Sequence, residues 1–278
     1  MSEQPFTLMG VINVTPDSFS DGGHYLEESR AIGHGVELAD QGADILDVGG
    51  ESTRPGAVPV SADEELSRVY PVIQGLAMAR PRVQISIDTS KARVAAAALD
   101  AGATIVNDVT ALRGDPRMAE VVAQSRAQCC LMHMLGEPRT MQDDPHYDDV
   151  VDEVKAFLEE RLAFAVAAGI GEDKILLDPG IGFGKTLRHN LELLARLDEL
   201  VAIGRPVIIG TSRKSFLGKL TGQPVDQRLP GTIATSVLAY ERGARIFRLH
   251  EVAPVADALK VTAATVAAWT TRPTSTAR

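Results

Sequence analysis

The sequence has little cysteine and few aromatic residues, and it has no long apolar run. Only two of its 278 residues are cysteine, and Cys129 and Cys130 are adjacent within an apolar stretch. Neighbouring residues on a strand point to opposite faces, so we expect two reduced, buried thiols rather than a disulfide. Reduced thiols are typical of a cytoplasmic protein, which is the location we expect.

Hydrophobic length and positive charge are also limited. No apolar run approaches the roughly 20 residues that a membrane-spanning helix needs. The N-terminal segment MSEQPFTLMG lacks the basic start and apolar centre of a signal peptide. The formal net charge is −9, which argues against a general nucleic-acid-binding protein but leaves room for a local anion site. We therefore expect neither a membrane nor a nucleic acid as a partner.

Eight short apolar runs are distributed along the whole chain. Continuous apolar runs of this length are typical of parallel strands that are covered on both faces. The stretches between them are alanine-rich or amphipathic, and Gly-Ala precedes three of the runs, at 42–43, 102–103 and 243–244. These pairs predict a repeated helix-to-strand turn. The expected strands are 8–13, 44–50, 84–89, 104–109, 128–133, 175–180, 207–212 and 246–250.

Eight strand–helix units in one chain predict an α/β fold, a (β/α)8 TIM barrel. No Pro-, Ser- or Gly-rich linker divides the chain, so we expect a single domain over residues 1–278, with 271–278 as a flexible tail. The rival architecture is an open doubly wound sheet. Its first strand would be expected to lead into G-x-G-x-x-G, whereas here it leads into NVTPDSFSDGG.

Polar residues gather at the ends of the eight predicted strands. In a barrel these ends form one rim, where barrel enzymes place their active sites. A single polar strand end is more simply a helix cap or a turn residue, but capping does not explain His, Lys and Arg. The residues at the predicted rim are Asn13, Glu51, Ser52, Thr53, Arg54, Asp88, Asn107, His133, Asp178, Ser212, Lys214, Arg248 and His250.

The residue types at the rim indicate the chemistry of a ligand. Asp88, Asn107 and Asp178 offer oxygen acceptors that suit a planar heterocycle with N–H donors. The cationic and imidazole side chains would bind an anion or a carbonyl oxygen. The sequence has neither the Cys/His spacing of a zinc site nor a Walker loop. The segment GIGFGK (180–185) has two interpretations, a phosphate-binding loop or, more simply, a tight turn after a strand.

Seven segments at these positions resemble the dihydropteroate synthases, in the same order along the chain. The resemblance spans roughly residues 8–262. It departs at Glu251, where the family often has Asp, and it retains the residues of the first loop that inactive relatives lack. The segments are MGVINVTPDSFSDGG (9–23), DVGGESTRPGA (47–57), ISIDTSKARVAAAALDAGATIVNDV (85–109), LMHMLGEPRTMQ (131–142), ILLDPGIGFGKT (175–186), IIGTSRKSFLG (208–218) and FRLHEV (247–252).

The resemblance implies the condensation of 6-hydroxymethyl-7,8-dihydropterin pyrophosphate with 4-aminobenzoate, in an SN1-like reaction of folate biosynthesis. It assigns the pterin to Asp88, Asn107, Asp178 and Lys214. It assigns the pyrophosphate to Asn13, Thr53, Arg54, Arg248 and His250, with Asn13 also holding Mg²⁺ and a helix near Pro254 adding N–H donors. The aminobenzoate is assigned to Phe19, Pro55, Phe183 and Ser215. The catalytic residues it implies are Asp21, Lys214, Arg248 and His250, and the family is usually a homodimer.

Three other functions remain open at this point. One is a methyltetrahydrofolate-dependent methyltransferase, which shares the pterin acids but needs neither a pyrophosphate site nor Ser212-Arg213-Lys214. Another is a catalytically silent pterin-binding paralogue, and the last is an aldolase with Lys214 as a Schiff-base lysine. Glu51 and Asp108 are expected to support the site, and His133 is expected equally to line the pocket or to support it. The histidines expected at the surface or in packing are His24, His34, His146 and His189.

Overall fold

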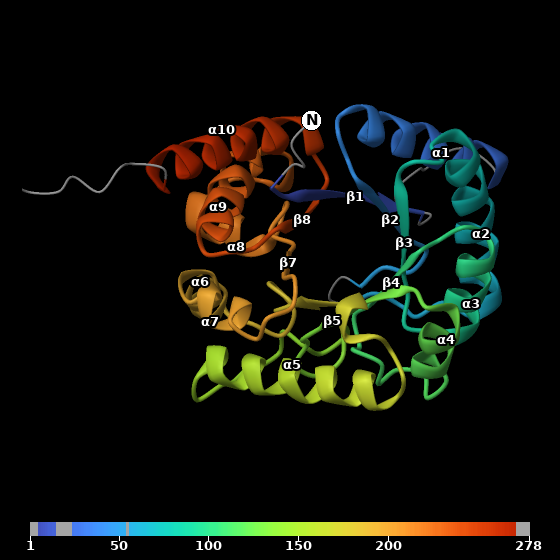
Figure 1. Ribbon diagram of the computed structural model, residues 1–278, viewed down its shortest axis with the longest axis horizontal. Coiled ribbons are helices and arrows are strands. Elements are labelled where there is room, and N and C mark those ends of the chain that lie inside the picture. The colour runs from blue at the N-terminus through green and yellow to red at the C-terminus, as the bar shows by residue number, and fades with distance from the viewer. Residues whose placement is uncertain (1–4, 15–23, 54–55, 271–278) are drawn as a thin grey trace, which may run out of the picture.

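The chain folds into a barrel of eight parallel strands surrounded by helices, which confirms the predicted architecture (Figure 1). The computed structural model describes residues 5–14, 24–53 and 56–270, so the expected tail at 271–278 lies outside them. The strands pair in the order β6-β5-β4-β3-β2-β1-β8-β7. Their bounds are β1 Thr7–Asn13, β2 Ile45–Gly49, β3 Gln84–Asp88, β4 Ile105–Asp108, β5 Gln128–Met132, β6 Ile175–Asp178, β7 Ile208–Ile209 and β8 Ile246–Leu249.

One isolated bridge between Leu177 and Val207 brings β6 and β7 together and nearly closes the barrel. All eight predicted strands are present, but the predicted β7 was too long. Only Ile208 and Ile209 pair with β8. The chain then turns, with the N–H of Lys214 donating to the carbonyl oxygen of Thr211 at 3.1 Å, so residues 210–212 leave the sheet before they form a ladder.

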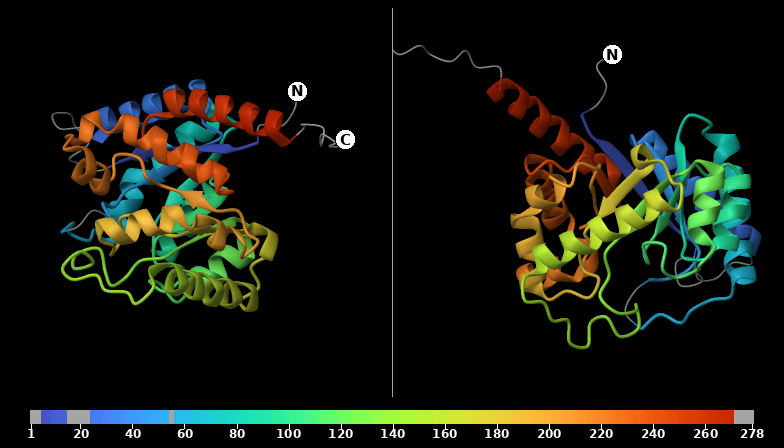
Figure 2. Two further views of the ribbon diagram at one scale, coloured as in Figure 1. Left: turned by 90° about the vertical axis from the view of Figure 1, so that its left-hand side faces the viewer. Right: turned by 60° about the horizontal axis from the view of Figure 1, so that its bottom comes forward.

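Helices form an outer layer around the strands, and the C-terminal part of α10 projects beyond the other helices (Figure 2). The chain has more helices than one per strand, because α6 and α7 both follow β6 and α8 and α9 both follow β7. No described helix is long and apolar enough to cross a membrane. The bounds are α1 His24–Asp40, α2 Ala62–Ala79, α3 Ala92–Asp100, α4 Met118–Ser125, α5 Val150–Ala167, α6 Leu187–Ala195, α7 Leu197–Val201, α8 Ser215–Thr221, α9 Leu229–Glu241 and α10 Val252–Thr270.

The three Gly-Ala pairs form the helix-to-strand turns that the sequence predicts. Gly42, Gly102 and Gly243 have φ angles of 102°, 116° and 100°, a conformation that disfavours residues with a Cβ atom. In each turn the N–H of the following alanine donates to a carbonyl oxygen five residues back, as Ala43 does to Leu38 at 3.0 Å. This bond satisfies an unpaired carbonyl of the last helical turn and directs the chain into the next strand.

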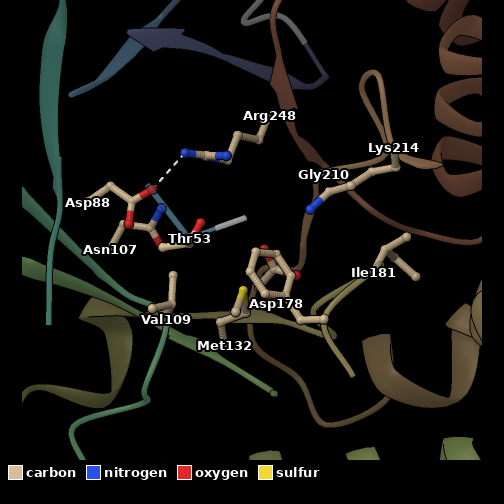
Figure 3. A pocket seen from close by; sticks show the side chains of 11 residues that line it. Thr53, Asp88, Asn107, Val109, Met132, Asp178, Ile181, Gly210, Lys214 and Arg248 are labelled. Carbon is tan, nitrogen blue, oxygen red and sulfur yellow. Dashed lines mark hydrogen bonds and ion pairs between the residues drawn. The ribbon is translucent and has the colours of Figure 1, made fainter. Parts of the chain in front are cut away.

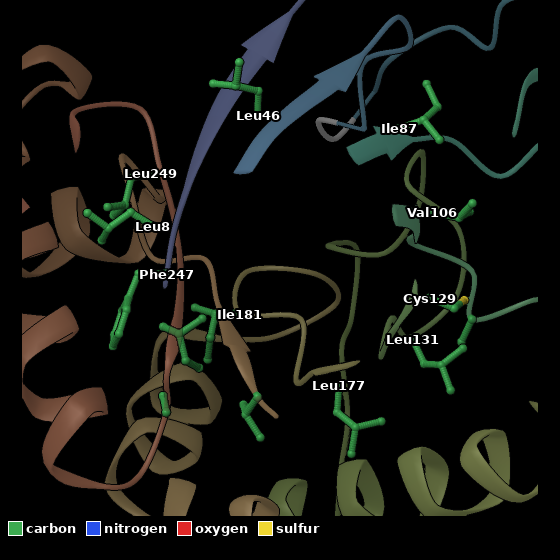
Figure 4. Packing of buried hydrophobic residues seen from close by; sticks show 14 of the residues in the cluster. Leu8, Leu46, Ile87, Val106, Cys129, Leu131, Leu177, Ile181, Phe247 and Leu249 are labelled. Atoms are coloured by element: carbon green, nitrogen blue, oxygen red, sulfur yellow. The ribbon is translucent and has the colours of Figure 1, made fainter. Parts of the chain in front are cut away.

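The larger hydrophobic core lies between the strands and the helices. Figure 4 shows its side chains pointing outward from the strands, among them Leu46, Val106 and Phe247. Cys129 belongs to this outer core, whereas its neighbour Cys130 faces the inside of the barrel. Both are buried free thiols, as predicted, and burial raises the pKa of each.

Candidate active site

The candidate site lies one layer above the apolar interior of the barrel. Strand side chains alternate, so the residue two positions after an inward-facing residue faces inward again, nearer the carboxyl end. These next positions hold Val11, Asp47, Asn107, Met132, Asp178, Gly210 and Arg248. The apolar interior below them is built from Met9, Ile45, Ile105, Cys130, Leu176, Ile208 and Ile246. On several strands a change from apolar to polar over two residues therefore marks the floor of a pocket.

A cavity with about 360 Å³ of empty space, part of it open to solvent, opens at this layer. Its size suits a small organic ligand. Figure 3 shows Asp88 and Asn107 on one side and Lys214 on the other. The predicted residues that line it are Thr53, Asp88, Asn107, Asp178, Phe183, Lys214 and Arg248. The lining residues that sequence reasoning missed are Val109, Met132, Ile181 and Gly210, which carry no polar signal.

Asp178 ends β6 as a buried carboxylate with one oxygen engaged. Its Oδ1 accepts a hydrogen bond from the N–H of Gly180 at 2.7 Å, and no described residue donates to Oδ2. Burial raises the pKa of Asp178, while the Gly180 bond and the positive charge of Lys214 oppose the increase. Asp178 therefore keeps Oδ2 available to accept N–H donors of a ligand.

Arg248 lies between two carboxylates inside the barrel. Its Nε donates to Asp47 Oδ2 at 2.6 Å, and Nη2 donates to Asp88 Oδ2 at 2.7 Å. Burial raises the pKa of Asp88 to about 7; the Arg248 charge opposes the increase and the Asp47 charge adds to it. The arginine therefore neutralises acids from two other strands while its side chain still lines the cavity.

Lys214 supplies a second cation on the opposite side of the cavity. Its Nζ lies 4.0 Å from the centroid of the Phe183 ring, a favourable cation–π geometry. Burial lowers the pKa of Lys214 to about 8; Arg248 lowers it further, and the acids Asp178 and Asp88 oppose the decrease. A Cβ atom on Gly182 would lie 3.1 Å from Lys214 Cδ, so this glycine leaves room for the lysine stem.

Three predicted site residues are described but do not line the cavity. Asn13 ends β1, and its side chain makes no hydrogen bond with another described residue. His250 follows β8, and its Nδ1 lies 3.0 Å from Ser212 Oγ, which also accepts the His250 backbone N–H at 3.1 Å. Ser215 is exposed at the start of α8. The predictions for Phe19, Asp21, Arg54 and Pro55 fall on residues outside those that the structure describes.

Asn13 suits a magnesium ion better than a zinc ion. No group of three or more His, Cys, Asp or Glu side chains in the described part of the chain could hold a metal. An amide oxygen at the carboxyl end of β1 is a hard ligand, and Mg²⁺ typically uses one or two protein ligands together with water and substrate phosphate. Asn13 therefore supplies an oxygen donor of the kind that Mg²⁺ binds.

The glycine-rich segment forms a tight turn, the simpler of its two interpretations. The N–H of Gly182 donates to Asn190 Oδ1 at 2.7 Å, and the N–H of Phe183 donates to the Gly180 carbonyl oxygen at 3.0 Å. With the N–H of Gly180 bonded to Asp178, these amides are not available to a phosphate. The glycines of the turn have positive φ angles, 67° for Gly180, 84° for Gly182 and 62° for Gly184.

Lys185, at the end of this turn, is a buried cation that the sequence analysis did not single out. It is 3% exposed. Its Nζ lies 2.9 Å from His133 Nδ1 and donates to the Phe183 carbonyl oxygen at 3.0 Å. Burial lowers the pKa of Lys185 to about 7, and the negative charge of Asp178 opposes this decrease. Burial and Lys185 together lower the pKa of His133 to about 2, so His133 is neutral and supports the turn from behind the cavity.

We expect Gly180→Ala to destabilise the protein far more than Gly204→Ala. Both glycines have positive φ, 67° and 91°. A Cβ atom on Gly180 would lie 1.8 Å from the His133 carbonyl oxygen, whereas one on Gly204 would meet nothing within 4 Å. The Gly204 variant should lose about 1–2 kcal/mol from backbone strain alone, and the Gly180 variant about 4 kcal/mol or more. Urea unfolding of both variants measures the difference, and equal losses would contradict this close packing.

Residues around the site hold its loops in place, as expected for Glu51 and Asp108. The Glu51 carboxylate binds Lys91 Nζ, which also binds the buried Glu65. Asp108 Oδ1 accepts the backbone N–H and the hydroxyl of Thr110, at 2.8 and 2.7 Å. These contacts fix the chain after β2 and β4.

The remaining predicted residues lie away from the cavity. Arg213 is exposed, and its Nε donates to Glu251 at 2.8 Å. His146 is exposed and His34 is partly exposed. His189 completes the capping box of α6. The side chain of His24 is outside the described part of the structure.

Comparisons with known proteins agree with this geometry. The model of the pterin-binding enzyme family matches residues 9–250. The dihydropteroate synthase of Escherichia coli (strain K12) is 47% identical over 261 residues, which are 94% of this chain and 92% of the relative.

Two solved structures are similar over nearly the whole fold. The Xanthomonas albilineans dihydropteroate synthase with 4-aminobenzoic acid has a TM-score of 0.89 at 48% identity, covering 98% of this chain and 95% of that one. The Yersinia pestis dihydropteroate synthase with a sulfonamide drug has a TM-score of 0.89 at 45% identity, covering 95% of both chains. On this identity and coverage, the chain belongs to the dihydropteroate synthases, transferases of the pterin-binding enzyme family.

Proposed function

We propose that this chain condenses 6-hydroxymethyl-7,8-dihydropterin pyrophosphate with 4-aminobenzoate, giving 7,8-dihydropteroate and pyrophosphate for folate biosynthesis. The observation that supports this proposal most directly is the buried Asp178 carboxylate. Its Oδ2 is available in a cavity that Asp88, Asn107 and Lys214 also line. The family of the chain supports the same reaction. Formation of dihydropteroate by the purified protein from the two substrates and Mg²⁺ tests this proposal.

The cavity side chains complement the edge of a pterin ring. Asp178 accepts hydrogen bonds from the 2-amino group and N3–H, because a carboxylate offers the paired acceptors that this edge requires. Asp88 and Asn107 bind other ring nitrogens. Lys214 donates to the ring oxygen and to N5, and its position 4.0 Å from the Phe183 ring centroid keeps the ammonium over the cavity.

Positive charge for the pyrophosphate comes from the end of β8 and the chain after it. Arg248 and His250 precede α10, which begins at Val252, within two residues of the expected start near Pro254. The helix N-terminus adds N–H donors for an anion. Thr53 and Arg54 contribute from the chain after β2. Asn13 would hold Mg²⁺, which would supply counter-charge to the pyrophosphate when bound.

The reaction separates bond cleavage from bond formation. The bond between the exocyclic methylene carbon and the pyrophosphate oxygen breaks first, and the electron-rich pterin delocalises the positive charge. Asp21 places a negative charge near this cation. The amine of 4-aminobenzoate then attacks the carbon and releases a proton to solvent. Phe19, Pro55 and Phe183 form the slot for its ring, with Ser215 near its carboxylate.

We also propose a cytoplasmic homodimer. Two buried free thiols suit a reducing compartment. The neighbouring helices α9 and α10 expose apolar side chains, with Leu238 51% and Val261 68% exposed, and a second copy of the chain would cover them. Sedimentation velocity tests the dimer, because a monomer at micromolar concentration would contradict it.

Pterin binding is expected to weaken as the pH falls below about 7. The carboxylate form of Asp88 accepts a ring N–H more strongly than the acid form does. Burial raises the pKa of Asp88 in the empty protein to about 7. The acid form therefore dominates below that pH, and affinity falls by about tenfold per pH unit. Calorimetry with 6-hydroxymethylpterin between pH 5.5 and 7.5 measures this slope. An affinity that does not change over this range would show that Asp88 is not an acceptor.

Sulfonamides are expected to compete with 4-aminobenzoate and to bind well only after pyrophosphate. The proposed slot includes Phe19 and Pro55, whose sequence neighbours Asn13 and Arg54 are proposed to bind Mg²⁺ and pyrophosphate. Binding at the two sites is therefore expected to be coupled, so that the first ligands raise the affinity for the sulfonamide. Titration of a sulfonamide with and without pyrophosphate, Mg²⁺ and a pterin measures the coupling. Equal affinity in both conditions would mean that the slot is complete in the empty enzyme.

The alternative functions are less well supported. A methyltransferase that uses methyltetrahydrofolate has no need for cations at the end of β8, and the comparisons place this chain among the synthases. The pKa of Lys214, lowered to about 8, would also suit a Schiff-base lysine, but this lysine lies beside acids that fit a pterin. A silent paralogue would bind the pterin without forming dihydropteroate, an outcome that the synthesis assay detects.

A further inference from the structure

Asp47 is a buried acid in the middle of β2 that does not line the cavity. Its exposed fraction is 0%. It lies two positions after Ile45 of the inner core, so its side chain faces the inside of the barrel. The register places it beside Val11 of β1 and Ser86 of β3. The carboxylate therefore lies at the level of the cavity floor, where a ligand cannot reach it directly.

The contacts of Asp47 join two residues that do line the cavity. Asp47 Oδ2 accepts from Arg248 Nε at 2.6 Å and from Asn107 Nδ2 at 3.3 Å. Its other oxygen, Oδ1, is buried and has no hydrogen-bond partner among the described residues. Leaving a buried carboxylate oxygen unpaired is costly, so a residue retained in this state is a candidate for a functional role.

We infer that Asp47 is a positioning residue of the synthase, holding the Arg248 guanidinium and the Asn107 amide in the orientations in which they meet the substrate. This role rests on the proposed function. Arg248 would otherwise have Asp88 as its only acidic partner in the described structure. Because Asp47 binds Arg248 Nε, the guanidinium does not depend on Asp88 alone. Asp88 can therefore still accept a hydrogen bond from the pterin ring.

The position of Asp47 also sets the charge around Asp88. Burial is the largest influence on the pKa of Asp88 and raises it. Among charged groups, Arg248 lowers this pKa, and Asp47, Glu65 and Asp108 raise it. Asp88 in turn acts on Lys214 across the cavity. Removing the Asp47 charge therefore removes one repulsion and leaves Arg248 to pair with Asp88 alone. Both changes act in the same direction and lower the pKa of Asp88.

Asp47→Asn tests the positioning role, because it keeps the size of the side chain and removes its charge. We expect kcat/KM for the pterin pyrophosphate to fall by about tenfold to a hundredfold, as a small misplacement of substrate-binding groups produces. We expect the affinity for 6-hydroxymethylpterin at pH 7.5 to fall in parallel. The pH below which that affinity declines should move down by about one unit. The same ligand is used throughout, so its own titration cancels.

Two further variants separate positioning from simple destabilisation. Ser86→Ala is the matched control, because Ser86 Oγ is also buried without a partner, and its register neighbour is Asp47. It should leave affinity, kcat/KM and the pH midpoint unchanged within about twofold. Asp47→Glu keeps the charge but moves the carboxylate, so it should lower kcat/KM while the pH midpoint stays near the wild-type value. That comparison remains informative if Asp47→Asn does not fold.

The outcomes distinguish this inference from the proposed function. Wild-type protein that makes no dihydropteroate overturns the synthase proposal itself. Wild-type protein that is active, together with an Asp47→Asn variant whose kcat/KM and pH midpoint are both unchanged, overturns the positioning role alone. The positioning role is also overturned if Asp47→Asn lowers kcat/KM without changing the pH midpoint and Ser86→Ala lowers kcat/KM by the same factor. That result would show an effect of packing.

Discussion

Asp178→Ala is expected to abolish measurable pterin binding. The carboxylate is proposed to accept two N–H donors from the ring, and its Oδ2 has no other donor among the described residues. Each lost hydrogen bond to a charged group costs about 1.5–3 kcal/mol. Losing two lowers the affinity by about a hundredfold to ten-thousandfold. Calorimetry with 6-hydroxymethylpterin measures the loss.

Two variants control for effects on the fold. Asp178→Asn keeps an oxygen that accepts the Gly180 N–H, so the turn remains, but its NH2 group faces the ring donors and binding should still fail. Met132→Leu changes another residue of the same cavity with little change in volume, and its affinity should stay within about tenfold. If the alanine and asparagine variants bind the pterin as tightly as wild type, Asp178 is not its anchor.

Arg248→Met should have the next largest effect, on both turnover and stability. It removes a cation proposed to bind the leaving group, and removal of one such donor typically lowers kcat by about 10²–10³-fold. It also leaves Asp47 and Asp88, 0% and 13% exposed at their side chains, without their shared partner. Removing one member of a buried ion pair costs about 3–5 kcal/mol of stability. Steady-state kinetics and urea unfolding measure the two losses.

The conservative variant separates charge from geometry at this position. Arg248→Lys keeps the positive charge but cannot donate to Asp47 and Asp88 together through a planar fork. We expect it to recover much of the stability and little of the turnover. An Arg248→Met variant that turns over within tenfold of wild type would show that the pyrophosphate is held elsewhere.

The cavity was largely predictable because it follows strand ends, and strand ends follow short apolar runs. Asp88, Asn107, Asp178 and Arg248 each lie within the last three residues of a predicted run, and all line the cavity. Because the strands of the barrel are parallel, their carboxyl ends all lie at one rim, and these side chains come together there. Strand lengths were less predictable. At β7 the ladder ends after two residues because the chain turns toward α8.

Asp47 and Lys185 were missed for a different physical reason. Neither has a local signal, because Asp47 is in the middle of a strand and Lys185 follows a glycine-rich turn. Their roles depend on partners distant in the sequence, with Asp47 and Arg248 201 residues apart and His133 and Lys185 52 apart. A buried polar residue reveals its function only when its partner is known, and the fold alone supplies that partner.

The most direct test of the proposed function is synthesis from purified components. Wild-type protein is incubated with labelled 4-aminobenzoate, the pterin pyrophosphate and Mg²⁺, and both products are quantified, with Asp178→Ala as the matched control. We predict dihydropteroate and pyrophosphate in equal amounts from wild type, none without the pterin pyrophosphate, and a loss of at least about a hundredfold in the variant at low substrate. Wild-type protein that binds 6-hydroxymethylpterin but forms no dihydropteroate would contradict the proposal and identify a silent pterin-binding protein.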